Sequence, residues 1–204
     1  MRIVENLTPK QALERLMEGN RRFVDSGQAS ATAWSAEHAT AGQKPFAVVL
    51  GCSDSRAPVE KYFDQGFGDI FVVRVAGNIV APSIIGSVEY AVAQFGTPLV
   101  LVMGHTGCGA VAATIEALRS GDSPESQNIR DITDRIAPHI EGIVHVEGSE
   151  NVLGEAVRAN VRASVELLRR NSGIIEERLN DGRVAVLGAE CELETGRVHL
   201  LDSL

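Results

Sequence analysis

The stretch Leu99-Val-Leu-Val-Met-Gly-His-Thr-Gly-Cys-Gly109 holds an apolar run that ends directly in a histidine and then a cysteine. A second stretch, Phe46-Ala-Val-Val-Leu-Gly-Cys52, ends in the same way. Unbroken apolar runs are typical of strands that are buried on both faces, as in a parallel sheet. In an open parallel sheet, ligands bind beyond the carboxyl ends of the strands. The two stretches therefore predict an α/β fold in which both polar ends face one site.

The rest of the chain alternates between helical and strand patterns. Thr8-Pro9 predicts the start of a helix, because threonine is a favoured N-cap and proline a favoured first residue, and Gly19 suggests its end. Further strands are predicted at 70–73, 183–187 and 197–201, the last returning as a hairpin after the turn signal Glu194-Thr-Gly. Helices are predicted at 83–94, 110–118, 151–170 and 173–179, with short helical pieces broken by Pro124, Pro138 and Gly148 between them.

These elements predict the architecture. Alternating strands and helices imply right-handed crossovers, so we expect a mostly parallel four-stranded sheet with a C-terminal antiparallel edge strand, flanked by helices. The length of 204 residues fits a single domain, 1–204, with an α/β core over 45–204. Residues 1–44 hold the N-terminal helix and an arm. The arm, residues 25–44, is rich in small residues, and we expect it to be extended and to wrap a partner subunit.

Composition limits the partners and the compartment. The net charge of −8 argues against nucleic acid, which is bound by clustered Lys and Arg. No run reaches the roughly 18 apolar residues of a membrane span, and the first residues lack the pattern of a secretory signal. Three cysteines, an odd number, disfavour a disulfide framework. We expect a cytoplasmic protein without a membrane or nucleic-acid partner, in which cysteines serve as metal ligands or catalytic thiols.

Cys52, His105 and Cys108 offer two thiolates and one imidazole. Three protein ligands leave the fourth tetrahedral position open, as in catalytic zinc sites. Soft thiolates disfavour magnesium and calcium, and zinc is the usual metal for this set. Cys108 also precedes a helix, whose positive end favours a thiolate. The alternative is two buried cysteines and a core histidine, the commoner fate of each residue alone; their equivalent positions at strand ends favour the metal site.

Asp54 and Arg56 follow the first of these cysteines. A carboxylate two residues from a metal-binding cysteine is able to ligate the metal itself and close the site. Arg56 can hold that carboxylate in a bidentate pair and keep it off the metal. The alternative interpretation is a surface ion pair in a turn, which contributes little.

Three other kinds of site fail on spacing. A cysteine phosphatase has an arginine after five intervening residues, where this sequence has Pro58. Gly104-His-Thr-Gly-Cys-Gly does not match the Gly-x-Gly-x-x-Gly of dinucleotide sites, and no Cys-x-x-Cys redox motif is present.

At these residues the chain resembles the β-class carbonic anhydrases. The family's motifs occur in the family's order, as Cys52-Ser-Asp-Ser-Arg56, Arg74-Val-Ala-Gly-Asn78 and His105-Thr-Gly-Cys-Gly109. The resemblance covers most of the chain, and the combined motif is highly specific. It implies zinc on Cys52, His105 and Cys108, with Asp54 and Arg56 as the catalytic dyad.

The resemblance further implies the reversible hydration of carbon dioxide to bicarbonate and a proton by a zinc-bound hydroxide. The dyad would orient the hydroxide, and Asp54 would close the site at low pH. The implied substrate-binding residues are Gln43, Phe71, Ala76, Gly77, Tyr90 and Gly109. Gln43 stands where family members place a glutamine that reaches a neighbouring subunit, so a homodimer or homotetramer is implied, embraced by the N-terminal helix and arm.

Two alternatives stay open beside this one. Relatives on the same scaffold hydrolyse carbon disulfide or carbonyl sulfide, and a non-catalytic zinc-binding protein of the same fold is the other candidate. The intact Asp54 and Arg56 favour the enzyme. Cys191, between Glu190 and Glu192 near the predicted hairpin, is interpreted as an ordinary packed or exposed thiol.

Overall fold

The computed structural model describes residues 7–27, 29, 36–122, 124–146 and 151–204. Within them, one sheet has the strand order β2-β1-β3-β4-β5, where β1 to β4 are parallel and β5 is antiparallel to β4. This confirms the predicted fold, including the antiparallel edge strand. The strands are β1 (Ala47–Gly51), β2 (Ile70–Arg74), β3 (Leu99–His105), β4 (Ala185–Cys191) and β5 (Val198–Leu200).

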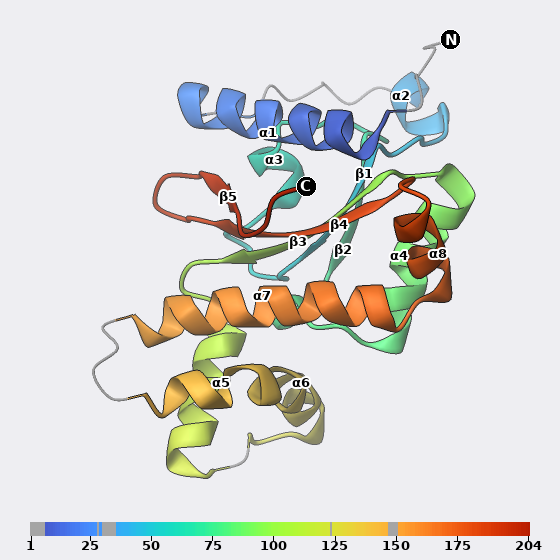
Figure 1. Ribbon diagram of the computed structural model, residues 1–204. Coiled ribbons are helices and arrows are strands. Elements are labelled where there is room, and N and C mark those ends of the chain that lie inside the picture. The colour runs from blue at the N-terminus through green and yellow to red at the C-terminus, as the bar shows by residue number, and fades with distance from the viewer. Residues whose placement is uncertain (1–6, 28, 30–35, 123, 147–150) are drawn as a thin grey trace.

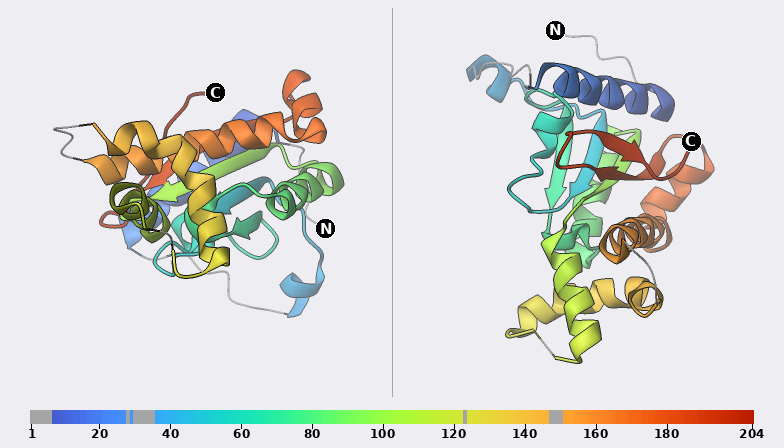
Figure 2. Two further views of the ribbon diagram at one scale, coloured as in Figure 1. Left: turned by 90° about the horizontal axis from the view of Figure 1, so that it is seen from below. Right: turned by 90° about the vertical axis from the view of Figure 1, so that its left-hand side faces the viewer.

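Helices cover both faces of the sheet (Figures 1 and 2). One face carries α1 (Pro9–Ser26) and α3 (Val59–Tyr62); the other carries α4 (Pro82–Phe95), α7 (Val152–Arg170) and α8 (Gly173–Asn180). Beyond α7 lie α5 (Gly109–Ser120) and α6 (Gln127–Val144), while α2 (Ala36–Thr40) and the 3-10 turn η1 (Ala76–Asn78) are short. None of the helices in the described ranges is long and apolar enough to cross a membrane.

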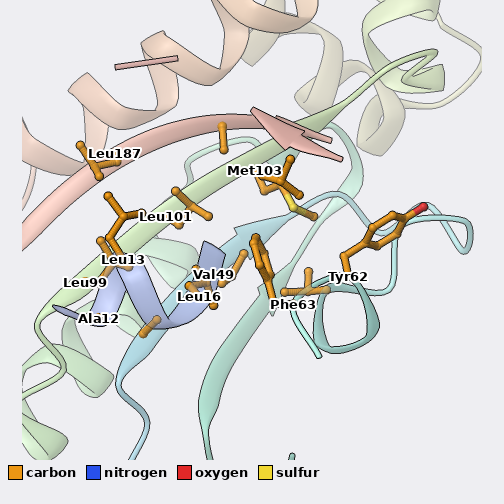
Figure 3. Packing of buried hydrophobic residues seen from close by; sticks show 14 of the residues in the cluster. Ala12, Leu13, Leu16, Val49, Tyr62, Phe63, Leu99, Leu101, Met103 and Leu187 are labelled. Atoms are coloured by element: carbon orange, nitrogen blue, oxygen red, sulfur yellow. The ribbon is translucent and has the colours of Figure 1, made fainter. Parts of the chain in front are cut away.

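The alternation of side chains along the strands divides the core into two layers. Val49, Leu101 and Met103 face α1 and α3, and Figure 3 shows them packed with Leu16 and Phe63. Their neighbours along the same strands pack on the opposite face, against α4, α7 and α8. Every residue of β1, β3 and β4 is buried, which explains why these strands are apolar except near their carboxyl ends, where β3 has His105 and β4 has Glu190.

A third apolar cluster lies between α5, α6 and α7 and also contains Cys52 and Cys108. Ile136 and Ile140 of α6 are fully buried in it. The prediction of short helical pieces between 122 and 150 is wrong here, because α6 continues through Pro138. Burial of its apolar stripe stabilises the helix by more than the hydrogen bond that the proline cannot donate.

Other boundaries differ from the sequence prediction as well. Strand β4 begins two residues later and ends four residues later than predicted, at Cys191. The segment 25–44 is not simply extended, since it includes the end of α1 and the short helix α2. Residues 28 and 30–35 of the predicted arm lie outside the described residues.

Gly19 is not the end of α1, which continues to Ser26 and ends where Gly27 turns left-handed at φ 65°. A Cβ atom on Gly19 would lie 1.8 Å from the carbonyl oxygen of Phe63. The next residue, Asn20, is buried and donates hydrogen bonds of 2.9 Å to the carbonyls of both Tyr62 and Gly196. The glycine therefore permits the close contact that fixes α1 on α3 and on the hairpin after β4.

We predict that Gly19→Ala lowers the free energy of unfolding by about 1–3 kcal/mol, because α1 must move away from the Phe63 carbonyl. Gly142→Ala in α6 is the matched control, since a Cβ atom there meets nothing within 4 Å. The control should leave stability unchanged or raise it by up to about 1 kcal/mol. Urea unfolding at one protein concentration measures both, and equal stability of Gly19→Ala and wild type would contradict the prediction.

Candidate metal centre

The pairing of β1 with β3 creates the site. In this parallel pair Gly51 lies opposite Met103, so Cys52 directly after β1 and His105 at the end of β3 reach the same edge of the sheet. Cys108 follows after a tight turn in which Gly107 adopts φ 67°, and it is the N-cap of α5. Ligand atoms of Cys52, His105 and Cys108 all lie within 4.8 Å of one another, and all three residues are buried. The structure thus brings together the three predicted ligands.

The imidazole of His105 is oriented for a metal. Its Nδ1 lies 3.0 Å from the carbonyl oxygen of Thr106, and because a carbonyl only accepts, Nδ1 carries the proton. The lone pair is then on Nε2, which is buried and has no hydrogen-bond partner among the described residues. An unpartnered buried nitrogen requires an explanation, and coordination of a metal ion supplies one.

The two sulfurs lie close enough to affect each other's protonation. The neighbouring Cys108 side chain is the largest cause that lowers the pKa of Cys52. The Cys52 side chain, together with burial, raises the pKa of Cys108. Burial lowers the pKa of His105, but the nearby Cys52 sulfur and the hydrogen bond with Thr106 outweigh it, so that this pKa is raised. Binding of a divalent cation by both sulfurs would release any proton held between them.

Asp54 and Arg56 form a bidentate pair beside the three ligands. Arg56 Nε lies 3.0 Å from Asp54 Oδ1, and Arg56 Nη2 lies 2.8 Å from Oδ2. Asp54 Oδ2 is also 3.9 Å from His105 Nε2, the nitrogen that would bind a metal. Arg56 holds the pKa of Asp54 well below its usual range, so the carboxylate stays ionised. A fixed acceptor thus stands next to the open side of the ligand set.

The loop that carries Cys52 and Asp54 is held by residues whose roles the sequence did not reveal. Arg74, at the end of β2, donates from Nε to the carbonyl of Cys52 at 2.9 Å and from Nη2 to that of Asp54 at 2.6 Å. Tyr62 donates to the carbonyl of Arg56 at 3.0 Å. A cation at the carboxyl end of a parallel strand was a usable signal for Arg74. Tyr62, the last residue of the short helix α3, gave none.

The turn η1 lies against the same sulfur. The amide of Gly77 donates to Cys52 Sγ at 3.3 Å. Gly77 and Asn78 accept hydrogen bonds from Asn160 and Ser164 of α7, at 2.8 and 3.1 Å. The signal for Asn160 and Ser164 was that they are polar residues in the buried stripe of α7. Of the predicted substrate residues, Ala76 and Gly77 thus belong to a turn beside the cluster, and Gly109 follows Cys108 at the start of α5.

Three other predicted substrate residues lie apart from the ligands of the same chain. Gln43 is exposed and precedes β1, so it stands at the opposite end of that strand from Cys52. Phe71 lies within β2 opposite Val48, in the core layer against α4. Its ring contacts Tyr90 and Phe95 at centroid distances of 6.3 and 6.4 Å, and Tyr90 is 53% exposed. Cys191, by contrast with the ligand cysteines, is fully buried on the α1 face.

Known proteins match this chain over the residues that form both the fold and the site. The family model described as carbonic anhydrase matches residues 47–198, which include the sheet and the three ligands. Carbonic anhydrase 2 of Mycobacterium tuberculosis is 39% identical over 98% of this chain and 96% of its own length. The carbonic anhydrase of Mycolicibacterium smegmatis is 40% identical with the same coverage.

Solved structures agree with the sequence matches. The β-carbonic anhydrase of Coccomyxa, in complex with acetazolamide, has a TM-score of 0.70 and 26% identity, covering 93% of this chain and 86% of that one. A tetrameric β-carbonic anhydrase of the ascomycete Sordaria macrospora has a TM-score of 0.69 and 25% identity, covering 80% and 83%. With a family match over most of its length and close relatives over nearly all of it, the chain belongs to the β-carbonic anhydrase family of enzymes.

Proposed function

We propose that this protein catalyses the zinc-dependent, reversible hydration of carbon dioxide to bicarbonate and a proton. The observation that carries the proposal is the cluster of Cys52, His105 and Cys108 with an ionised carboxylate fixed beside it. Three ligands and one adjacent acceptor are what a hydrolytic or hydrating metal site requires. A structural site would close its fourth position with a protein ligand.

Zinc fits this donor set better than the other common divalent cations. Two thiolates exclude the hard cations, and the unpartnered Nε2 of His105 completes a mixed sulfur and nitrogen set. When bound there, zinc acts as a Lewis acid that makes a hydroxide nucleophile available near neutral pH. Because thiolates in this site must stay reduced, we also propose a reducing compartment, the cytoplasm.

Asp54 and Arg56 orient the nucleophile. Both oxygens of Asp54 are occupied by Arg56, yet Oδ2 still faces the open side near His105 Nε2. That oxygen can accept a hydrogen bond from the nucleophile and so direct its lone pair at carbon dioxide. The amide of Gly109, in the first turn of α5, is suited to bind an oxygen of the forming bicarbonate, because the first amides of a helix have no partner within the helix and the helix end is positive.

We further propose that the chain, as one domain over 1–204, functions as a homodimer or homotetramer whose pocket is completed by a second copy. Gln43, Phe71 and Tyr90 would then serve the neighbouring subunit. The exposed ring of Tyr90 and the position of β2 at the edge of the sheet support this, since both leave surface for a partner. The tetrameric assembly of the Sordaria relative is in agreement.

Cys108→Ser should lose zinc and activity together. Zinc content should fall from about one ion per chain to less than about a tenth, because two protein ligands remain. Cys191→Ser is the control, as this cysteine is equally buried but lies outside the ligand cluster. Metal analysis and a carbon dioxide hydration assay on the same samples decide the matter; full zinc occupancy in Cys108→Ser would remove it from the ligand set.

Arg56→Lys should lower kcat about 10²-fold while zinc stays bound, since lysine cannot hold both carboxylate oxygens. Arg135→Lys is a matched control, because Arg135 forms the same bidentate pair with Asp131 on α6, at 3.0 and 3.1 Å. Stopped-flow hydration kinetics compare the two. Equal loss in both variants, or none in Arg56→Lys, would contradict the role of the dyad.

The hydration rate should rise from about pH 6 to about pH 9, because the nucleophile forms by loss of a proton. Asp54 is ionised throughout this range, since Arg56 depresses its pKa, so its own titration adds no inflection. At the low end, where the hydroxide is scarce, Asp54 would leave Arg56 and close the site. A flat pH profile would contradict the prediction. A zinc-loaded protein that acts on carbonyl sulfide but not on carbon dioxide would overturn the proposal that carbon dioxide is the substrate.

A further inference from the structure

The sulfur of Cys52 has a hydrogen-bond donor that belongs to neither the ligand set nor the dyad. The amide of Gly77 lies 3.3 Å from Cys52 Sγ, and both residues are buried. A hydrogen bond to a ligand sulfur withdraws electron density from it and so reduces what the sulfur gives to a metal. Two thiolates give more electron density to a metal than imidazoles do, and they therefore make the metal a weaker Lewis acid. The hydrogen bond from the Gly77 amide opposes this effect.

The turn that presents this amide has a backbone conformation that needs support. Gly77 has φ 68° and Asn78 has φ 44°, so two successive residues are in the left-handed region. Glycine adopts it freely, whereas Asn78 does so only where its surroundings favour it. Space is also restricted, because a Cβ atom on Gly77 would lie 2.8 Å from Ile136 Cδ1.

Two side chains of α7 supply the support. Asn160 Nδ2 donates to the carbonyl of Gly77 at 2.8 Å, and Ser164 Oγ donates to that of Asn78 at 3.1 Å. The two residues are four apart and therefore on one face of the helix, and each is only 2% exposed. Both stand among buried apolar residues of α7, such as Val161 and Val165. Their polar atoms serve the turn.

We propose that Asn160, assisted by Ser164, is a positioning residue that holds the η1 turn so that the Gly77 amide hydrogen-bonds the ligand sulfur of Cys52. In this way α7 sets how strongly that sulfur donates to the metal. The inference rests on the proposed function, because it takes Cys52 as a ligand. It concerns a residue of α7 that acts on the ligand sulfur only through the η1 turn.

Cobalt(II) in place of zinc gives a direct test, because thiolate ligands produce a charge-transfer absorption band whose energy falls as the sulfur becomes a stronger donor. In cobalt-loaded Asn160→Ala, the band should shift to longer wavelength than in the wild type. Thr133→Val is the matched control, since Thr133 is a buried side chain on α6 that donates only to the carbonyl of Arg130. Its band should stay in place.

No shift in Asn160→Ala, a shift to shorter wavelength, or an equal shift in Thr133→Val would overturn the inference. If Asn160→Ala does not fold, Ser164→Ala decides: a smaller shift in the same direction is expected, and an unmoved band overturns the proposal. A wild-type protein that binds cobalt without any thiolate band would instead overturn the metal centre and everything built on it. A wild-type band that no variant moves leaves the proposed function intact and removes only the role of Asn160.

Discussion

Two neighbouring parallel strands that end at the same level are the constraint on which the site depends. Because β1 pairs with β3 in register, Cys52 and His105 arrive at one edge of the sheet, and the short turn to Cys108 adds the third ligand. Ordering these three side chains costs conformational entropy. The folding of the sheet, which is buried on both faces, offsets that cost. The fold itself thereby brings the three candidate ligand atoms within 4.8 Å of one another.

The polar residues around the three ligands form two groups with distinct effects. Arg56 fixes and ionises Asp54, while Arg74 and Tyr62 hold the carbonyls of the loop that carries it. On the other side, η1 directs an amide at the sulfur of Cys52. In the mechanism that we propose, the first group would direct the nucleophile and the second would set the electron density at the metal. Both depend on helices and strands remote in sequence, so the geometry belongs to the whole fold.

Much of this was readable from the sequence, and the rest was not for physical reasons. Uninterrupted apolar strands that end in Cys52 and His105 indicated both the sheet and the ligands, because parallel strands place their carboxyl ends together. Pro138 and Gly19 misled because local propensity was outweighed by tertiary packing against the core and the Phe63 carbonyl. Asn160 and Ser164 are polar residues on a buried stripe, and only the structure shows which carbonyls they bind. The positions of Gln43 and Tyr90 acquire a function only with a second copy, which one chain does not contain.

X-ray absorption at the zinc edge of the zinc-loaded protein tests the central claim most directly. The account predicts two sulfur neighbours at about 2.3 Å, one imidazole nitrogen at about 2.0–2.1 Å and one further light atom. Replacement of His105 should remove the imidazole signal and leave both sulfurs. A first shell without sulfur, or one of four sulfurs, would show that the metal binds elsewhere and would contradict the account.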